Sequence, residues 1–144
     1  DSDFFRYASK QHLFVFKQLN LGNQGEAPII ASSWFISSEI GNPIVVLTRN
    51  LLYSYWQDYD YLLNYFTFHL FFAMACRRYE NEWESIPAFN NSSPHMLMFE
   101  LKRDYSSERW EQLMKMSGIH KLQRYDDYSD LKKSNYCKIL DTYL

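Results

Sequence analysis

The stretch from residue 28 to residue 76 constrains the fold of this chain more than any other part. Its sequence is PIIASSWFISSEIGNPIVVLTRNLLYSYWQDYDYLLNYFTFHLFFAMAC. It combines a β-branched and aromatic segment, a turn and two strongly apolar segments, while apolar segments elsewhere are mostly short. We therefore predict a buried strand, a capped turn and two helices, against which the rest of the chain packs.

The first half of this stretch predicts a strand followed by a helix. Ile29 to Ser38 carries apolar groups on both faces, which is typical of a strand inside a covered sheet. Asn42 then precedes Pro43, and these residue types favour the N-cap and the first helical position. The following apolar residues recur at helical spacing and include Ile44, Leu47, Leu51, Leu52 and Tyr55.

The second half predicts a helix from about Asp58–Tyr61 to about Tyr79. Its apolar residues point in nearly every direction around a helix, which indicates burial in a core or in a membrane. The uninterrupted apolar run has about a dozen residues and contains His69, whereas a membrane span needs about 20. We therefore predict a buried helix of a soluble domain.

Composition excludes some classes of protein. The 144 residues suffice for one compact domain, and a net charge of -2 gives no electrostatic basis for nucleic-acid binding. The two cysteines, Cys76 and Cys137, do not make a disulfide scaffold, so we predict a reducing, cytoplasmic compartment. The acidic start, Asp1 to Asp3, lacks the basic region of a signal peptide, and the abrupt opening favours a fragment of a longer protein.

Aromatic residues make up 19% of the chain, with twelve Tyr, eleven Phe and four Trp. Many aromatic side chains bury a large area per residue, so a core built of aromatics is one interpretation. Flat rings also stack on carbohydrate and gather at membrane interfaces. Composition leaves these alternatives open.

The remaining segments predict short elements around the core. Residues 3–7 and 12–17 are strand candidates, 20–26 an exposed turn, and 77–84 a helix end with a short helical turn stopped at Ile86-Pro87. Residues 95–101 form a short helix capped by Ser93, and Ser106 or Ser107 caps another that ends at Gly118. The latter helix has the apolar stripe Trp110, Leu113 and Met114.

Residues 119–125 are predicted as extended or loop. Residues 126–144 mix acids, lysines and tyrosines without a clean period and are predicted as a loosely packed tail. The expected domain is therefore 1–125. Its fold class is α/β, or α+β within this fragment, with a few strands and about four helices.

Two D-x-D sequences could hold a divalent cation against a sugar-nucleotide diphosphate. Asp58 and Asp60 lie between two predicted helices, where acids ordinarily serve as partners of a helix N-terminus. Asp1 and Asp3 lie at a predicted strand start, but a match this short also arises by chance.

The four histidines share no metal-ligand spacing. His69 lies on the buried helix, where a satisfied core histidine is the ordinary interpretation. His95 follows Ser-Pro at a helix start, where backbone amides can bind an anion. His120 and Lys121 follow the helix stop at Gly118, and such a pair on a loop could contact a diphosphate.

Four segments, taken in order, carry a resemblance to a known family: SSWFISSEIGNPIVVLTRNLLYSYW, DYLLNYFTFHLFF, NSSPHMLMFEL and IHKLQRY. Together they are similar to the C-terminal half of the capsular polysaccharide synthesis proteins, bacterial glycosyltransferases of the GT-A type. The resemblance implies a nucleotide-sugar-binding α/β domain whose metal-binding DXD lies upstream of this chain. It implies a nucleotide-sugar donor, a glycan acceptor and a divalent cation, Mn²⁺ or Mg²⁺, in the intact parent.

The resemblance also implies roles for particular residues. His120 could approach the diphosphate or metal, and Ser33 with Trp34 could line the sugar or acceptor pocket. His69, His95 and Lys121 complete the substrate-binding candidates. Where this sequence has Asn64, the family pattern usually has an acid; an amide cannot accept the proton that a catalytic base must take.

From this resemblance we expect a glycosyltransferase-like protein of capsule synthesis. The chain alone should lack activity, bind no cation and self-associate through faces that the missing half would cover. Peripheral contact with the inner face of the bacterial membrane is compatible with capsule assembly. The alternative is a non-catalytic helical module that binds glycan or protein.

Overall fold

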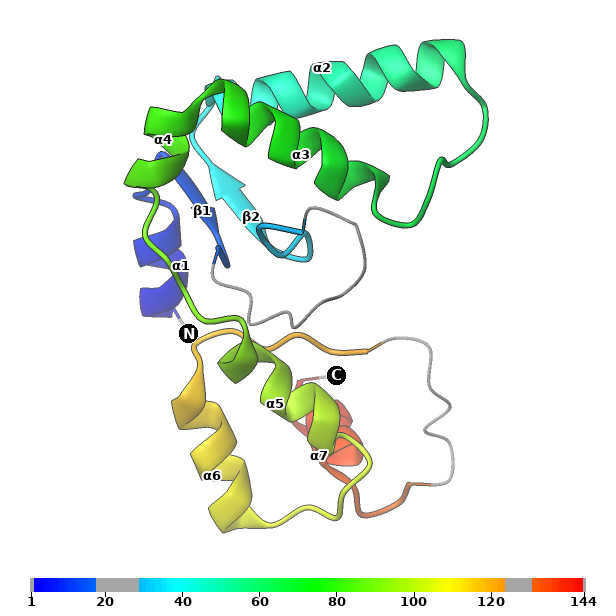
Figure 1. The fold of residues 1–144 in the computed structure, drawn as a ribbon. Helices are drawn as coiled ribbons and strands as arrows, with labels where there is room; N and C mark the ends of the chain where they lie inside the picture. Colours follow the sequence, from blue (N-terminus) through cyan, green and yellow to red (C-terminus); the bar gives the residue numbers. More distant parts are fainter. Residues whose placement is uncertain (1, 18–28, 124–130, 144) are drawn as a thin grey trace. The chain divides into compact units, whose positions relative to one another are not determined.

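The computed structural model describes residues 2–17, 29–123 and 131–143 (Figure 1). The chain divides into two compact units: the N-terminal unit is 5–91, and the C-terminal unit is 92–144 with residues 1–4. The described residues form a mixed α+β fold, as predicted. Its elements are α1 (Ser2–Ala8), β1 (Leu13–Val15), β2 (Ile36–Ser38), α2 (Pro43–Asp58), α3 (Thr67–Arg78), α4 (Glu80–Ser85), α5 (Ser92–Glu100), α6 (Ser107–Met116) and α7 (Asn135–Tyr143).

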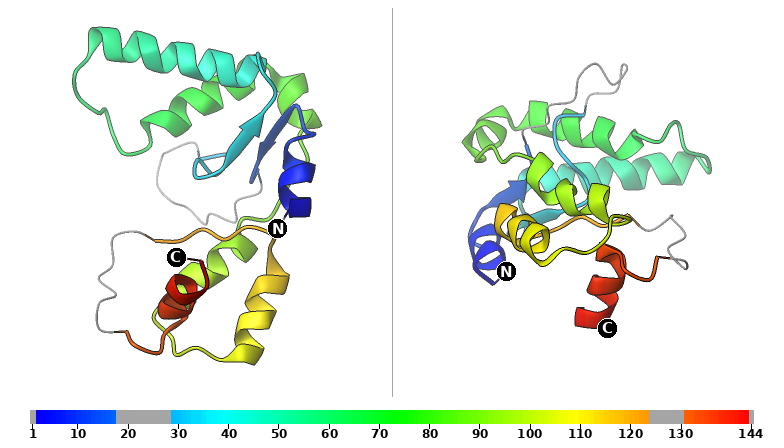
Figure 2. Two further views of the ribbon diagram at one scale, coloured as in Figure 1. Left: turned by 180° about the vertical axis from the view of Figure 1, so that it is seen from behind. Right: turned by 90° about the horizontal axis from the view of Figure 1, so that it is seen from below.

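In the N-terminal unit, a helical hairpin packs with a small antiparallel sheet. The hairpin consists of α2 and α3, and the sheet pairs Leu13 with Ser38 and Val15 with Ile36 (Figures 1 and 2). Leu13 and Val15 belong to a buried core that also draws on both hairpin helices. Its other members are Ala31, Ile44, Phe72, Ala75, Cys76 and Ile86. Most of this core comes from the 28–76 stretch.

A second cluster in the same unit is aromatic. Phe14 and Phe16 lie next to the core strand positions and are also buried, so β1 is covered on both faces. Phe14 packs against Phe35 and Phe89 with ring centroids 5.8 and 5.0 Å apart. The high aromatic content therefore serves the core in this part of the chain.

Two predicted strands differ from the structure. The strand expected over 29–38 is confined to Ile36–Ser38. The Ser32 N–H donates to the Phe16 carbonyl at 3.1 Å, so the earlier residues still contact β1 without forming a regular ladder. The strand expected over 3–7 is wrong, because this segment is α1. Asp3 in the first turn and Arg6 in the last turn suit the helix dipole.

The predicted start of α2 is confirmed. Asn42 is its N-cap, and the side-chain Oδ1 accepts hydrogen bonds from the N–H groups of Ile44 at 3.1 Å and Val45 at 3.3 Å. Pro43 occupies the first turn, as expected. Before the cap, Gly41 has a φ of 82°, a left-handed conformation that favours glycine.

The predicted start of α3 near residues 58–61 is wrong, since the helix begins at Thr67. Asn64 and Thr67 form a local turn just before it. The Asn64 N–H donates to Thr67 Oγ1 at 3.2 Å, and the Thr67 hydroxyl donates to the Asn64 carbonyl at 2.8 Å. These side-chain bonds compete with helical ones and delay the helix.

In the C-terminal unit, α5, α6 and α7 surround a small core of Leu97, Leu101 and Leu113. Ser106 caps α6 as predicted, with its Oγ accepting from the Arg109 N–H. Ser93 is not the cap of α5, because that helix already begins at Ser92.

No regular element had been predicted after residue 125, yet 135–143 form α7. Leu131, Tyr136 and Ile139 pack on the small core of this unit. The buried Asn135 amide donates to the Glu100 carbonyl at 2.9 Å and so ties α7 to the end of α5. No helix among the described residues has both the length and the apolar character needed to cross a bilayer.

Candidate functional site

The first candidate site lies in the C-terminal unit, beside the first turn of α5. The Lys121 N–H donates to the Pro94 carbonyl at 2.9 Å. This hydrogen bond brings the backbone of His120 and Lys121 next to that of Pro94 and His95. The sequence had indicated these residues as two separate anion contacts, and the structure joins them at one helix start, where backbone amides favour negative charge.

A tight turn after α6 positions His120. The Ser117 hydroxyl donates to the Ile119 carbonyl at 2.6 Å and accepts from the Ile119 N–H at 3.3 Å. Burial lowers the pKa of His120 below its ordinary value. The imidazole is therefore neutral at physiological pH. Its Nδ1 is buried and meets no hydrogen-bond partner in the described part of the chain.

A neutral histidine cannot attract an anion by charge, but it can donate one hydrogen bond and accept another. The cation in this neighbourhood is the partly exposed Lys121. His95, on the first turn of α5, has its ring centroid 6.4 Å from that of Phe99. The arrangement thus places Lys121 and one unsatisfied imidazole nitrogen beside the first turn of α5.

The second candidate site lies in the N-terminal unit and contains Trp34. Its indole stacks on Phe16, with centroids 5.0 Å apart and planes inclined by 14°. Its Nε1–H donates to the Asn91 Oδ1 at 3.0 Å. One face and the polar edge of Trp34 are therefore already in use, which limits its role in a sugar pocket to the rest of the ring. Ser33 is exposed.

His69 belongs to the same neighbourhood. It is half-buried on α3, and burial lowers its pKa, with the backbone of Ala31 acting in the opposite direction. Its ring lies 5.7 Å from Phe68 and 5.9 Å from Phe66, centroid to centroid. The Ala31 interaction brings His69 to the segment that carries Ser33 and Trp34.

Asn64 has a structural role in the turn before α3. Its side-chain Oδ1 accepts from the Phe66 N–H at 2.7 Å, and its backbone forms the bonds to Thr67 described above. An aspartate could accept the same Phe66 bond. The turn therefore accounts for either residue type here, and the catalytic role stays a prediction.

The D-x-D at 58–60 lies between two helices, as predicted, but next to the end of α2 and not at the start of α3. Asp58 is the last residue of α2, and Asp60 is exposed in the connection to α3. Acids at a helix C-terminus oppose the helix dipole rather than complement it. No group of three His, Cys, Asp or Glu side chains in the described ranges could hold a metal ion. His120 as a metal ligand thus stays a prediction.

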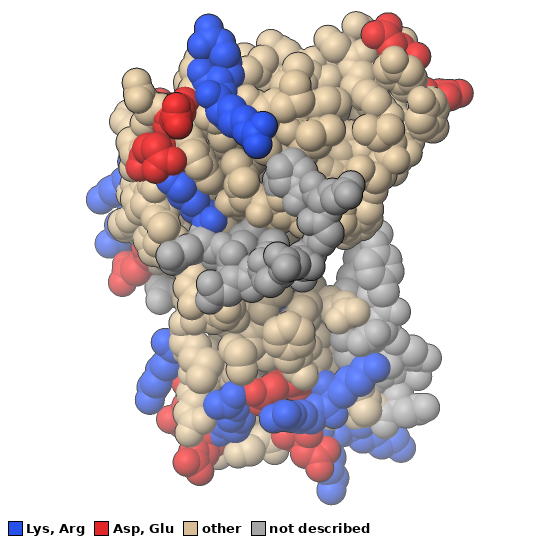
Figure 3. All heavy atoms as spheres, in the orientation of Figure 1, with Lys and Arg blue, Asp and Glu red and all other residues tan. Residues whose placement is uncertain are grey.

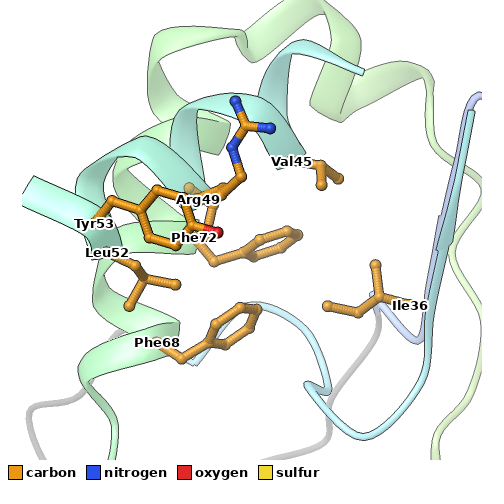
Figure 4. Close-up of a pocket in the computed structure, with 8 residues that line it drawn as sticks. Ile36, Val45, Arg49, Leu52, Tyr53, Phe68 and Phe72 are labelled. Carbon is orange, nitrogen blue, oxygen red and sulfur yellow. The ribbon is translucent and has the colours of Figure 1, made fainter. Parts of the chain in front are cut away.

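An apolar groove, which the sequence had not indicated, runs between α2, α3 and β2. Its volume is about 160 Å³ (Figure 4). Phe68 and Phe72 reach it from α3, and Ile36 closes it from the sheet. The lining from α2 is Val45, Thr48, Arg49, Leu52 and Tyr53. The i, i+3, i+4 spacing of Arg49, Leu52 and Tyr53 was the available signal for this groove in the sequence.

Cys76 is not a nucleophile in this fold. It is buried in the core, and burial raises the pKa of its thiol to about 12. In the native protein at pH 8 we expect a thiol reagent to modify Cys76 roughly a thousandfold more slowly than in the unfolded chain, because so little thiolate forms. Mass spectrometry after timed alkylation, with Cys137 as internal control, measures this. Equal labelling of both thiols would contradict it.

Comparison with known proteins identifies the family. The sequence model of the capsular polysaccharide synthesis proteins matches residues 1–140. The chain therefore belongs to the capsular polysaccharide synthesis protein family, as the four sequence segments had indicated. Neither the curated proteins nor the solved structures provide a match.

Proposed function

We propose that this chain is the acceptor-side part of a glycosyltransferase of capsular polysaccharide synthesis. In this proposal the parent moves a sugar from a nucleotide donor to a growing glycan. Family membership supports a role in capsular polysaccharide synthesis. The hydrogen bond between the Lys121 N–H and the Pro94 carbonyl is the observation that supports the diphosphate site. This contact brings Lys121 and His120 to the first turn of α5, where the helix dipole favours an anion such as a diphosphate.

The candidate residues have defined tasks in two sites, a diphosphate site in the C-terminal unit and an acceptor site in the N-terminal unit. The Lys121 ammonium group binds the charged diphosphate oxygens, and the dipole of α5 adds to the attraction. His120, neutral and with its Nδ1 unsatisfied, donates or accepts one oriented hydrogen bond. Trp34 and Ser33, with His69 nearby, form the acceptor side in the N-terminal unit. Asn64 can orient a hydroxyl group but cannot deprotonate it.

A divalent cation, Mn²⁺ or Mg²⁺, belongs to the proposal for the intact parent only. The described residues offer no cluster of three ligands for it. We therefore assign no step to a metal in this chain.

The test is donor binding. Calorimetric titration of UDP-sugars and other nucleotide sugars into the parent protein, with and without Mn²⁺, should reveal one preferred donor. Lys121→Ala should weaken its binding about tenfold, because an ammonium–phosphate contact is lost while the backbone bond to Pro94 remains. Lys115→Ala is the matched control, since Lys115 is exposed on α6 and pairs with Glu111 at 3.8 Å.

The outcomes separate the two classes of function. A preferred donor whose binding depends on Lys121 supports the transferase. Absence of binding by every donor to a folded parent would overturn it. Binding of capsular glycan without any donor would instead favour the helical binding module.

A further inference from the structure

The connected end of the α2–α3 hairpin carries exposed apolar side chains that the core does not use. Leu62 is 63% exposed, Leu63 58% and Tyr65 89%. The surface comprises Trp56, Tyr59, Tyr61, Leu62, Leu63 and Tyr65. We call this set the hairpin end. Large apolar side chains gathered in this way mark an interaction surface.

We propose that the hairpin end docks the protein on a lipid membrane, at the level of the headgroups. Its composition matches that environment, because Trp and Tyr prefer the interface between water and hydrocarbon, and leucines insert below it. The proposal rests on the hairpin alone and stands whether or not the protein is a transferase.

The shape of the surface favours a lipid occupant over a protein. Leu62 and Leu63 are consecutive residues of a non-helical connection, and both are more than half exposed. They therefore project from a loop rather than form one flat helix face. A fluid bilayer accepts such a projection directly, whereas a protein partner or a second copy needs a matching pocket.

The backbone on either side of Leu62 and Leu63 is partly hydrogen-bonded, which lowers the cost of leaving water. The Tyr55 hydroxyl donates to the Tyr61 carbonyl at 2.7 Å, and the Tyr59 N–H donates to the Tyr55 carbonyl at 2.9 Å. The Asn64 side chain accepts from the Phe66 N–H at 2.7 Å. Rings brace the same segment, since the Tyr55 and Tyr59 centroids lie 5.1 Å apart. These contacts brace the segments before Leu62 and after Leu63.

Charge at the hairpin end specifies the type of lipid. Asp58 and Asp60 are the only formally charged residues between Asn50 and Cys76. The arginines of the hairpin lie away from this end, Arg49 within α2 and Arg77 with Arg78 in the last turn of α3. In Figure 3 acidic atoms lie at the far end of the hairpin, beside an uncharged surface over its middle, and basic atoms lie toward its other end. Such a surface suits zwitterionic headgroups and is repelled by anionic ones.

The apolar groove lies along the same hairpin. Arg49, Leu52, Tyr53 and Trp56 follow one another at i, i+3, i+4 and i+7, so they share one face of α2. The first three line the groove, and Trp56 belongs to the hairpin end. Leu52 and Tyr53 therefore connect the groove to Trp56, and an acyl chain at the docking surface would find this groove beside it.

Sedimentation with phosphatidylcholine vesicles tests the proposal. We expect the 144-residue chain to bind, and Leu62→Ser combined with Leu63→Ser to lower the partition coefficient at least about tenfold, because two inserting side chains are lost. Ile40→Ser is the matched control, since Ile40 is fully exposed but lies in the turn before α2. Circular dichroism melting checks that each variant folds.

Two further measurements distinguish a lipid partner from a protein partner. Adding phosphatidylglycerol should weaken binding, and Asp58→Asn with Asp60→Asn should restore it. Brominated lipid should quench tryptophan fluorescence in the wild type and much less in Trp56→Phe. Absence of vesicle binding would overturn the proposal, as would equal loss in Ile40→Ser. Dimers that the double serine variant dissociates, without lipid binding, would assign the surface to a second copy.

Discussion

Asn42→Ala should lower the free energy of unfolding of the N-terminal unit by about 1–3 kcal/mol, the sum of a lost helix cap and a lost side-chain hydrogen bond to the His12 carbonyl. The Asn42 side chain is buried, and its amide oxygen and amide nitrogen have different partners. The Oδ1 caps α2, while the Nδ2 donates to the His12 carbonyl at 3.2 Å and to Glu82 Oε1 at 3.3 Å. One amide thus connects the sheet, α2 and α4.

Urea unfolding followed by tryptophan fluorescence measures this effect, since Trp34, Trp56 and Trp83 all lie in that unit. Asn42→Asp is the matched control, because it keeps the capping oxygen and loses only the donor. Its carboxylate would face Glu82, so its deficit should shrink as the pH falls and the pair takes up a proton. A loss below about 0.5 kcal/mol in the alanine variant would contradict the connecting role of this residue.

Glu100→Gln should cost the C-terminal unit about 1–3 kcal/mol at neutral pH, the range for a charged hydrogen bond lost from a buried group. The Glu100 carboxylate is buried and accepts from Arg109 Nε at 3.0 Å and also from Arg109 Nη2. Arg103 Nη1 lies 3.8 Å from the same carboxylate. Glutamine keeps the shape of the side chain and removes its charge.

The stability that Glu100 contributes should decrease as the pH falls. The hydrogen bond from Arg109 lowers the pKa of Glu100 below its ordinary value, and burial acts in the opposite direction. A lowered pKa contributes stability above the unfolded pKa of about 4.3, and this stability is lost as the pH falls through the folded pKa. Wild type and Glu100→Gln should therefore converge in acid.

Urea unfolding across this acid range provides the measurement. Glu111→Gln is the control, because Glu111 is exposed and its pair with Lys115 contributes little. Curves for wild type and Glu100→Gln that stay parallel down to low pH would contradict the prediction. Arg109→Met removes the main donor but leaves the carboxylate, so this variant should gain stability as the pH falls.

Local chemistry predicted the helix boundaries that depend on it. The caps Asn42 and Ser106 and the stop at Ile86-Pro87 were visible in the sequence because each acts within a few residues. The delayed start of α3 was missed, although Asn64 and Thr67 are neighbours in the chain, because apolar periodicity dominated the interpretation. The helix α7 was not predicted because its apolar side chains are stabilised only by packing on Leu97, Leu101 and Leu113, which are distant in the sequence.

The individual residues of the diphosphate site were predictable from the sequence, but their proximity in space was not. His95 follows a Ser-Pro pair and His120 follows a helix stop, and both signals are local. What joins them is the bond between Lys121 and Pro94, which depends on how α5 and α6 pack. The buried Nδ1 of His120 and its lowered pKa likewise follow from packing, which no short motif specifies.

The two halves of the N-terminal unit close loops of very different length. The turn between α2 and α3 joins helices that are adjacent in sequence, whereas β1 and β2 pair Leu13 with Ser38 across a longer chain segment. Short loops close sooner and local contacts form faster. The hairpin should therefore exist before the sheet during folding. Asn42, already fixed at the start of α2, then offers its amide to the arriving His12 carbonyl and helps select the strand register.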